Sequence, residues 1–152
     1  MRIGDICTRE VVTCVPGTSA AALAQLMRDR HVGDVVVVEA REGRDVPVGI
    51  VTDRDLVVQV IARHRDPDAV TASDMMGELA TALESEAVYD AIWHMRRQGS
   101  RRLPVVDANN TLRGILTVDD VTRFLAEELT ELSRTVPRQR QEEVRRFTPA
   151  DR

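Results

Sequence analysis

Lysine is absent from this chain of 152 residues, and all 21 of its basic residues are arginines. This absence excludes a phosphate-binding loop built on lysine and a lysine that forms Schiff bases. Aromatic residues make up 3% of the chain, which argues against a platform that stacks single-stranded nucleic acid. No apolar run approaches the roughly 20 residues of a membrane helix, so no membrane insertion is expected.

Other classes are excluded by charge and by the cysteines. The formal net charge is −4, and no basic stripe is present, so no nucleic-acid partner is expected. Cys7 and Cys14 stand seven positions apart, which matches no common zinc spacing, and we expect both to be free and half-buried near a strand. The segment Met1–Arg9 is charged and lacks the apolar stretch of a secretory signal, which favours a cytoplasmic location.

Two stretches of seven residues share one pattern. Gly49–Asp55 reads Gly-Ile-Val-Thr-Asp-Arg-Asp and Gly114–Asp120 reads Gly-Ile-Leu-Thr-Val-Asp-Asp, at a separation of 114 − 49 = 65 residues. Such a recurrence indicates a duplicated unit. In each copy an apolar strand runs into Thr-x-x-Asp, a signal for the start of a helix. A helix N-terminus presents free N–H groups and the positive end of a dipole, which together favour an anion such as phosphate.

The rest of the chain repeats around these stretches. Each unit is predicted to read strand, helix, strand, strand, helix, with units at 1–66 and 67–134. In the first unit the expected elements are a short strand within 10–15, a helix from 18 or 19 to 30, a strand at 35–38, a charged connection at 41–46, a strand at 48–51 and a helix at 53–64. In the second unit they are a short strand at 79–83, a helix at 86–98, a strand at 103–106, a turn at 107–110, a strand at 112–116 and a helix from 118 to about 133.

Beyond the second unit the composition changes. Residues 135–152 mix arginine and glutamate with few apolar side chains, and Pro137 is expected to break the preceding helix. The segment is predicted to be a charged, solvated tail. The alternative is a helix that packs on a second subunit. Tyr89 and Trp93 stand four positions apart on one helix face, which indicates either internal packing or a dimer contact.

With the repeat laid out, residues 3 to 130 resemble a pair of cystathionine-β-synthase (CBS) domains, the tandem called a Bateman module. The resemblance rests on the two Gly-Ile-x-Thr-x-x-Asp stretches, on Asp5-Ile6-Cys7 and Asp74-Met75-Met76 at the unit starts, and on the stretch from Arg101 to Val106. It implies an α/β fold in which two pseudo-symmetric β-α-β-β-α units pack sheet to sheet. It also implies two equivalent clefts that bind adenosyl ligands such as AMP, ADP, ATP or S-adenosylmethionine.

The resemblance assigns roles by motif position. Thr52 and Thr117 would contact phosphate, while Asp55 and Asp120 would contact the ribose hydroxyls. The short strand of each unit would cup the adenine, and the candidate residues there are Thr13, Val15, Thr81 and Leu83. No catalytic residue, metal site or required cofactor is implied. A purely structural alternative exists, because Thr-x-x-Asp also caps a helix without any ligand.

The charges predict that the two clefts differ. Arg101 and Arg102 precede the apolar strand of the second unit, and Pro104 follows in the same motif and completes the candidate ligand-binding residues. At the matching offset of 95 − 27 = 68 the first unit has Gly33 and Asp34. Because an arginine fork suits phosphate oxygens, one cleft should be the better phosphate site, served by Arg101 or Arg102. The alternative is that both arginines lie on the surface without such a role.

These observations favour a non-enzymatic regulatory module that binds an adenine nucleotide between its units and signals to a protein partner, and a homodimer is expected. The alternative is a structural or oligomerisation module without a physiological ligand. An enzyme is disfavoured because no nucleophile–base pair, metal cluster or glycine-rich phosphate loop is visible.

Overall fold

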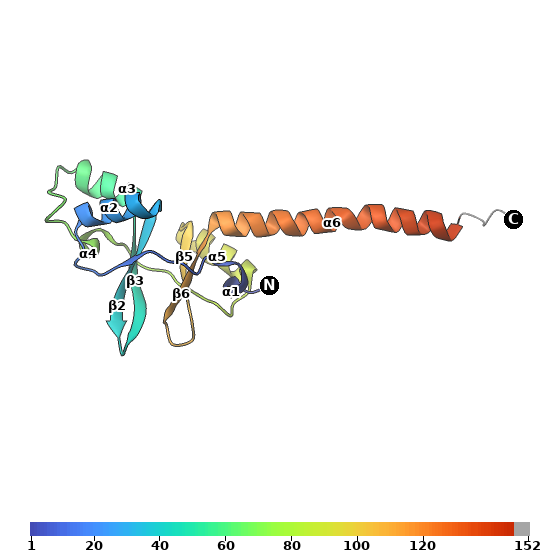
Figure 1. Cartoon of the computed structure of the whole chain (residues 1–152), viewed down its shortest axis with the longest axis horizontal. Coiled ribbons are helices and arrows are strands. Elements are labelled where there is room, and N and C mark those ends of the chain that lie inside the picture. The colour runs from blue at the N-terminus through green and yellow to red at the C-terminus, as the bar shows by residue number, and fades with distance from the viewer. Residues whose placement is uncertain (148–152) are drawn as a thin grey trace.

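A computed structural model describes the backbone of residues 1–147 and the side chains of residues 1–135 and Arg145. Two three-stranded sheets stand beside each other, each with helices on its outer face, and a long helix projects from the second unit (Figure 1). The strands are β1 (Thr13–Cys14), β2 (Asp34–Arg41), β3 (Arg44–Thr52), β4 (Ala82–Leu83), β5 (Arg102–Val106) and β6 (Leu112–Thr117). The helices are α1 (Ile3–Ile6), α2 (Ala20–Arg30), α3 (Asp53–Asp55), η1 (Leu56–Ile61), α4 (Ala72–Met75), α5 (Val88–Gln98) and α6 (Val118–Phe147).

The two sheets have the same topology. Their strand orders are β1-β2-β3 and β4-β5-β6, with a parallel first pair and an antiparallel second pair in each. Between them lies a shared cluster of Val36, Val38 and Ile115, with Ile50 packed against it. The predicted α/β fold of two units packed sheet to sheet is therefore confirmed.

The run of four valines in β2 follows from this position between two layers. Val35 and Val37 belong to the core between the first sheet and its helices, whereas Val36 and Val38 belong to the cluster between the sheets. Successive side chains of a strand point to opposite faces, so a strand covered on both sides needs apolar residues throughout.

The two units exchange their starting segments. α1 packs into the core of the second unit through Ile3, which is fully buried, and α4 packs into the core of the first unit through Met75. Two isolated bridges, Arg2 with Ala87 and Ser19 with Thr71, tie these crossings to the starts of α5 and α2. The relative placement of the units is thus fixed by backbone hydrogen bonds as well as by the contact between the sheets.

The predicted charged connection at 41–46 is wrong. β2 and β3 continue as a paired hairpin to Arg41 and Arg44, and the turn contains only Glu42 and Gly43. Glu42 and Gly43 have positive φ values, 52° and 75°, as a two-residue hairpin turn requires. Glycine at the second position adopts such a value readily. In the second hairpin the predicted turn at 107–110 is confirmed, because Asp107 accepts the N–H groups of Asn109 and Thr111.

The predicted helix at 53–64 is present in a different form. After one α-helical turn in α3, η1 is a π-helix in which Ala62 N–H donates to Val57 O at 2.9 Å. The run is rich in β-branched residues, which crowd the preceding turn of an α-helix, and a wider turn relieves that crowding. Val57, Val58 and Ile61 in this run are exposed.

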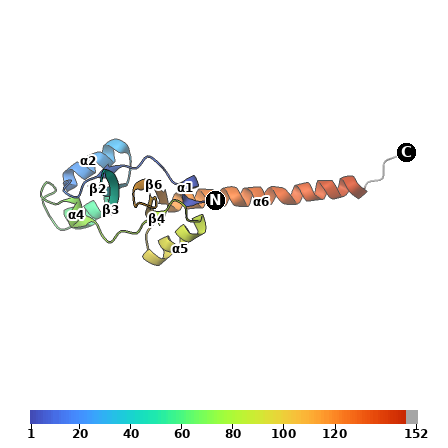
Figure 2. The same cartoon turned by 90° about the horizontal axis from the view of Figure 1, so that it is seen from below.

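The predicted end of the last helix near residue 133 is wrong, while the charged, solvated character of the segment after it stays a prediction. α6 continues through Pro137 to Phe147 and leaves the body of the module as a projecting rod (Figures 1 and 2). Arginine, glutamine and glutamate around the proline are strong helix formers, which offsets the proline penalty of about 3 kcal/mol. The remainder of the predicted tail, residues 148–152, lies outside the described residues. Within the part described, every helix is too short or too polar to cross a bilayer.

Candidate functional site

The two repeated stretches fold into matching strand-to-helix junctions. At the end of β3, Thr52 donates from N and from Oγ1 to Asp55 Oδ2, at 2.8 and 2.7 Å. At the end of β6, Thr117 makes the same two contacts with Asp120 Oδ2, at 2.9 and 2.7 Å. In return Asp55 N–H and Asp120 N–H donate to the threonine hydroxyls at 3.3 and 3.2 Å. Each junction is therefore a complete capping box.

The second carboxylate oxygen at each junction is held less tightly. Oδ1 of Asp55 lies 3.4 Å from the Gln59 amide, which also donates to the Met75 carbonyl at 3.0 Å. Oδ1 of Asp120 lies 3.7 Å from Arg123 Nη1. One oxygen of each carboxylate thus secures the helix start, and the other has capacity for a further donor such as a ribose hydroxyl.

One cavity adjoins the second junction. It has a volume of about 230 Å³ and is lined by Asp34, Arg101, Arg102, Thr117, Val118 and Asp119. The lining combines two arginines and two aspartates with the N-terminus of α6. Three of the predicted site residues, Arg101, Arg102 and Thr117, are brought together here.

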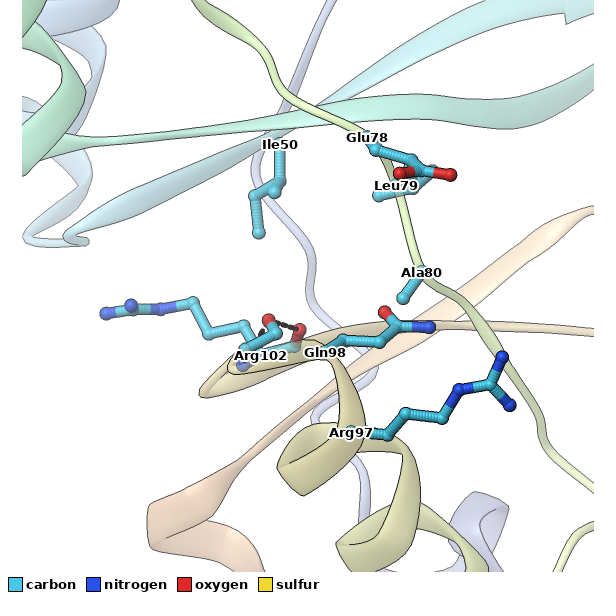
Figure 3. Close-up of a pocket in the computed structure, with 8 residues that line it drawn as sticks. Ile50, Glu78, Leu79, Ala80, Arg97, Gln98 and Arg102 are labelled. Carbon is cyan, nitrogen blue, oxygen red and sulfur yellow. Dashed lines mark hydrogen bonds between the residues drawn. The ribbon is translucent and has the colours of Figure 1, made fainter.

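A second cavity lies under the strand that leads into the first junction. It has a volume of about 390 Å³ and is lined by Ile50, Glu78, Leu79, Ala80, Arg97, Gln98, Ser100 and Arg102. Figure 3 shows Ile50 above Arg102, with Leu79 and Ala80 along one side and Gln98 and Arg97 beyond. The first unit and the second unit both contribute to its walls, so the cavity lies between them.

Arg102 connects the two junctions. Its backbone pairs with Thr117 in the second sheet, while its Nε atom lies 2.5 Å from Oδ2 of Asp34 in the first unit. A Cβ atom placed on Gly33 would lie 3.7 Å from Nη2 of Arg102 and 3.4 Å from Oδ2 of Asp53. The guanidinium therefore reaches from the second unit to the start of the first Thr-x-x-Asp helix.

The remaining candidate residues lie elsewhere. Thr13, Val15 and Leu83 are exposed, and Thr81 is half-buried. Residues 78–80 line the second cavity instead, immediately upstream of the predicted Thr81. The cause is local: β4 contains two residues, so the preceding residues are free to cross between the sheets. Pro104 is fully buried, at the position equivalent to Val36 between the sheets.

The sequence analysis did not find Arg97, Gln98 and Ser100. They enter the site because α5 ends at Gln98 and Gly99 reverses the chain with a φ of 62°. Ser100 then fixes the backbone of Arg102: its hydroxyl donates to the Arg102 carbonyl at 2.6 Å and accepts the Arg102 N–H at 3.2 Å. The signal in the sequence that could have found them is Gly99, which stands between the predicted helix at 86–98 and the two arginines and marks a helix end.

The cysteines and acidic groups show no metal site in the described part of the chain. Cys7 and Cys14 are free thiols, half-buried as predicted, and burial raises the pKa of each. A raised pKa keeps the thiol protonated and poorly nucleophilic. His94 on α5 makes a contact of 3.4 Å with Glu86 through its Nε2 atom.

With this geometry established, the chain belongs to the CBS domain family: the family model matches residues 3–61 and 69–127, once in each unit. The uncharacterized protein MK0525 of Methanopyrus kandleri is 39% identical over 120 residues, which cover 78% of this chain and 60% of that protein. The CBS domain protein PAE2072 of Pyrobaculum aerophilum, whose structure is complexed with AMP, is 26% identical with a TM-score of 0.71, over 79% of this chain and 89% of that one. A hexameric CBS-CP12 protein from bloom-forming cyanobacteria is 26% identical with a TM-score of 0.71, over 80% and 69%. The predicted CBS pair is thereby confirmed.

Proposed function

We propose that this chain is a regulatory module that binds an adenine nucleotide between its two CBS units and passes the state of the ligand to a protein partner. Proteins built from CBS pairs are generally regulatory rather than catalytic. The observation that carries the proposal is the cavity beside the second junction, where Arg101, Arg102 and Thr117 meet the N-terminus of α6. The complex of the PAE2072 protein with AMP supports the class of ligand.

The second junction supplies the groups that a nucleoside phosphate needs. At the start of α6 the Val118 N–H donates to Arg101 O and the Asp120 N–H donates to Thr117 Oγ1, which leaves the N–H of Asp119 for a ligand. This N–H group and the fork of an arginine both suit phosphate oxygens. Asp120 would accept the ribose hydroxyls through the oxygen that the cap does not occupy. The half-buried Thr117 would turn its hydroxyl from Asp120 towards the phosphate.

The charges of the cavity favour few phosphate groups. Two arginines and two aspartates, Asp34 and Asp119, line it, so their formal charges cancel. Asp53 adds negative charge beside the first junction, close to Arg102. A triphosphate would face these carboxylates, whereas a monophosphate needs one cationic contact. We therefore place AMP ahead of ATP as the ligand.

The proposed signal is a change in the relative position of the units. A ligand held by residues of both units favours the arrangement in which it makes the most contacts, and only this difference in free energy drives a switch. The exchanged segments α1 and α4 join the same two units. A shift of one unit would therefore displace the backbone at the start of α2 and of α5.

The test is a thermal-shift screen of AMP, ADP, ATP, NAD(H) and S-adenosylmethionine on protein shown by mass spectrometry to carry no ligand. A ligand at about 100 times its dissociation constant raises the free energy of unfolding by about 2.7 kcal/mol. We expect the largest rise in melting temperature with AMP. Absence of a shift with every compound would refute the proposed binding and favour a structural module.

A second candidate function is assembly, and one surface favours it. A groove of about 430 Å³ between α5 and α6 is lined by Ile92, Met95, Val121 and Leu125, with Arg96 and Arg101 at its rim. Tyr89, Trp93, Leu129 and Leu132 are more than half exposed on the same two helices. Exposed apolar side chains in this number mark an interaction site.

The partner that suits this surface is a second copy of the chain. The exposed leucines of α6 are interleaved with Glu127, Glu128 and Glu131, whereas the rim of the groove is basic. In an antiparallel pair the acidic part of one α6 would meet the arginines of the other copy. We propose a homodimer through α5 and α6. The hexamer of the CBS-CP12 protein shows that relatives assemble.

A further inference from the structure

Arg102 is a single cation that borders both cavities. It lines the cavity of about 230 Å³ beside the second junction and the cavity of about 390 Å³ under β3. In Figure 3 its side chain extends away from Gln98 and Arg97, towards the first unit. Arg101, by contrast, is exposed and borders only the first of these two cavities.

In the part of the chain that the structure describes, one N–H group of the Arg102 guanidinium lacks a hydrogen-bond acceptor, and an anion could supply one. Nε lies 2.5 Å from Asp34 Oδ2, yet this buried atom has no aligned hydrogen-bond acceptor within the described residues. A buried N–H group without an acceptor costs free energy. The contact is therefore an ion pair that restrains Arg102 without satisfying it. If the side chain swings off Asp34 into a cavity, a phosphate oxygen there would supply the acceptor that Asp34 does not.

We propose that Arg102 serves whichever cavity holds a phosphate, so that the two clefts bind anionic ligands with negative coupling. This inference rests on the proposed binding of adenine nucleotides. A guanidinium is one planar fork, and directing it at a phosphate in one cleft withdraws it from the other. Asp34 competes with both ligands for the same group. The second AMP should then bind about tenfold more weakly than the first, as expected for the loss of one charged hydrogen bond.

The experiment is isothermal titration of the ligand-free full chain with AMP and, separately, with adenosine and with S-adenosylmethionine. AMP should give two binding events that differ about tenfold in dissociation constant. Adenosine has no phosphate, so its binding should be weaker and should not depend on Arg102. Arg102→Ala should weaken the first AMP event to about the affinity of the second and so abolish the tenfold difference. Arg101→Ala, the matched control, should weaken binding in one cleft and still leave two unequal events.

Asp34→Asn tests the same contact from the other side and leaves Arg102 in place. Removing the competing carboxylate should tighten the first AMP event by about threefold, the scale of a partly exposed ion pair. Circular dichroism of each variant establishes that it is folded. If Arg102→Ala does not fold, the Asp34→Asn titration still decides the question.

Several results would overturn the inference. Two AMP events of equal affinity in the wild-type chain, or a tenfold difference that persists in Arg102→Ala, would show that the clefts do not share this arginine. An unchanged affinity in Asp34→Asn would show that Asp34 does not compete. Binding of adenosine or S-adenosylmethionine without binding of AMP would refute the coupling alone. Absence of binding by all three compounds would refute the proposed function itself, and the coupling with it.

Discussion

Gly114 lies against Cys7 so closely that a Cβ atom at position 114 would stand 2.8 Å from the Cys7 Sγ atom and 2.8 Å from the carbonyl oxygen of Thr8. The Thr8 backbone is fixed, because it exchanges two hydrogen bonds of 2.9 Å with Ile115. Gly49 has the equivalent relationship with Met76. The glycine of each repeated stretch therefore admits the starting segment that crosses over from the other unit.

Gly114→Ala should destabilise the fold. The methyl group would meet a backbone oxygen that cannot move without breaking the bridge to Ile115, and overpacking of this kind costs about 1–3 kcal/mol. Urea denaturation should show a lower midpoint at an unchanged slope. Gly17→Ala is the matched control, since a Cβ atom there meets nothing within 4 Å. Equal stability of the two variants would contradict the close approach.

The second prediction separates capping from ligand binding. Among the described residues a third capping box of the Thr-x-x-Asp type is present, in which Thr71 donates from N and Oγ1 to Asp74 at 2.8 and 2.9 Å. Neither Thr71 nor Asp74 borders a cavity between the units, whereas Thr117, the cap partner of Asp120, lines the cavity beside the second junction. Loss of a cap costs about 0.5–2 kcal/mol, so Asp120→Ala and Asp74→Ala should both lower the free energy of unfolding.

Only Asp120→Ala should also weaken AMP binding, by about tenfold or more, because it removes the proposed ribose contact as well. Isothermal titration on both variants, at a temperature where each is folded, supplies the comparison. An AMP affinity reduced equally in both would mean that the aspartate at the junction acts only through the helix. An unchanged affinity in both would remove Asp120 from the site.

The local part of this architecture could be predicted from the sequence. The four valines of β2, the helix starts at Thr52 and Thr117 and the turn at Asp107 each depend on residues within a few positions of one another. These features share short-range causes, which residue order displays directly. The packing of the sheets face to face came from the resemblance to a pair of CBS domains.

Contacts between distant segments could not be predicted in the same way. Residues 78–80 line a cavity because the chain crosses between the sheets there, and Ser100 enters it because of the turn at Gly99. The ion pair of Arg102 with Asp34 joins residues far apart in the chain, although their equivalence at an offset of 68 was visible. The predicted helix ended too early because Pro137 was expected to break it. The helix propensity of the arginine, glutamine and glutamate residues around Pro137 carries α6 on to Phe147.

The third prediction concerns pH. Hydrogen bonds from Thr111, Arg113 and Asn109 hold the pKa of Asp107 at about 2, well below its ordinary value of 3.8. In the unfolded chain this carboxyl binds a proton at higher pH than in the folded chain, so stability falls as pH falls through the interval from about 4 to 2. Above that interval the contribution of Asp107 is fully present.

Asp107→Asn keeps an oxygen that accepts the turn N–H groups but removes the charge. The difference in unfolding free energy between the wild-type chain and this variant should shrink between pH 5 and pH 2, because only the wild-type chain has this carboxylate to protonate. Urea denaturation of both chains at each pH measures this difference in unfolding free energy. The other carboxyl groups are the same in both chains, so their contributions cancel. A difference that stays constant with pH would contradict the lowered pKa.

The last prediction tests assembly through α5 and α6. Leu129 and Leu132 are 66% and 67% exposed, and Trp93 is 55% exposed, so none of them supports the core of a single chain. Replacing Leu129 and Leu132 together by glutamate would place two further charges in the proposed contact while changing the isolated fold little. Sedimentation velocity should then show a monomer for the variant and a dimer for the wild-type chain.

The matched control is Val57→Glu with Ile61→Glu on η1. These two side chains are 53% and 67% exposed and lie on the first unit, away from the groove. Dissociation of this control, with the α6 variant still dimeric, would move the interface to the first unit, and a monomeric wild-type chain would refute the homodimer.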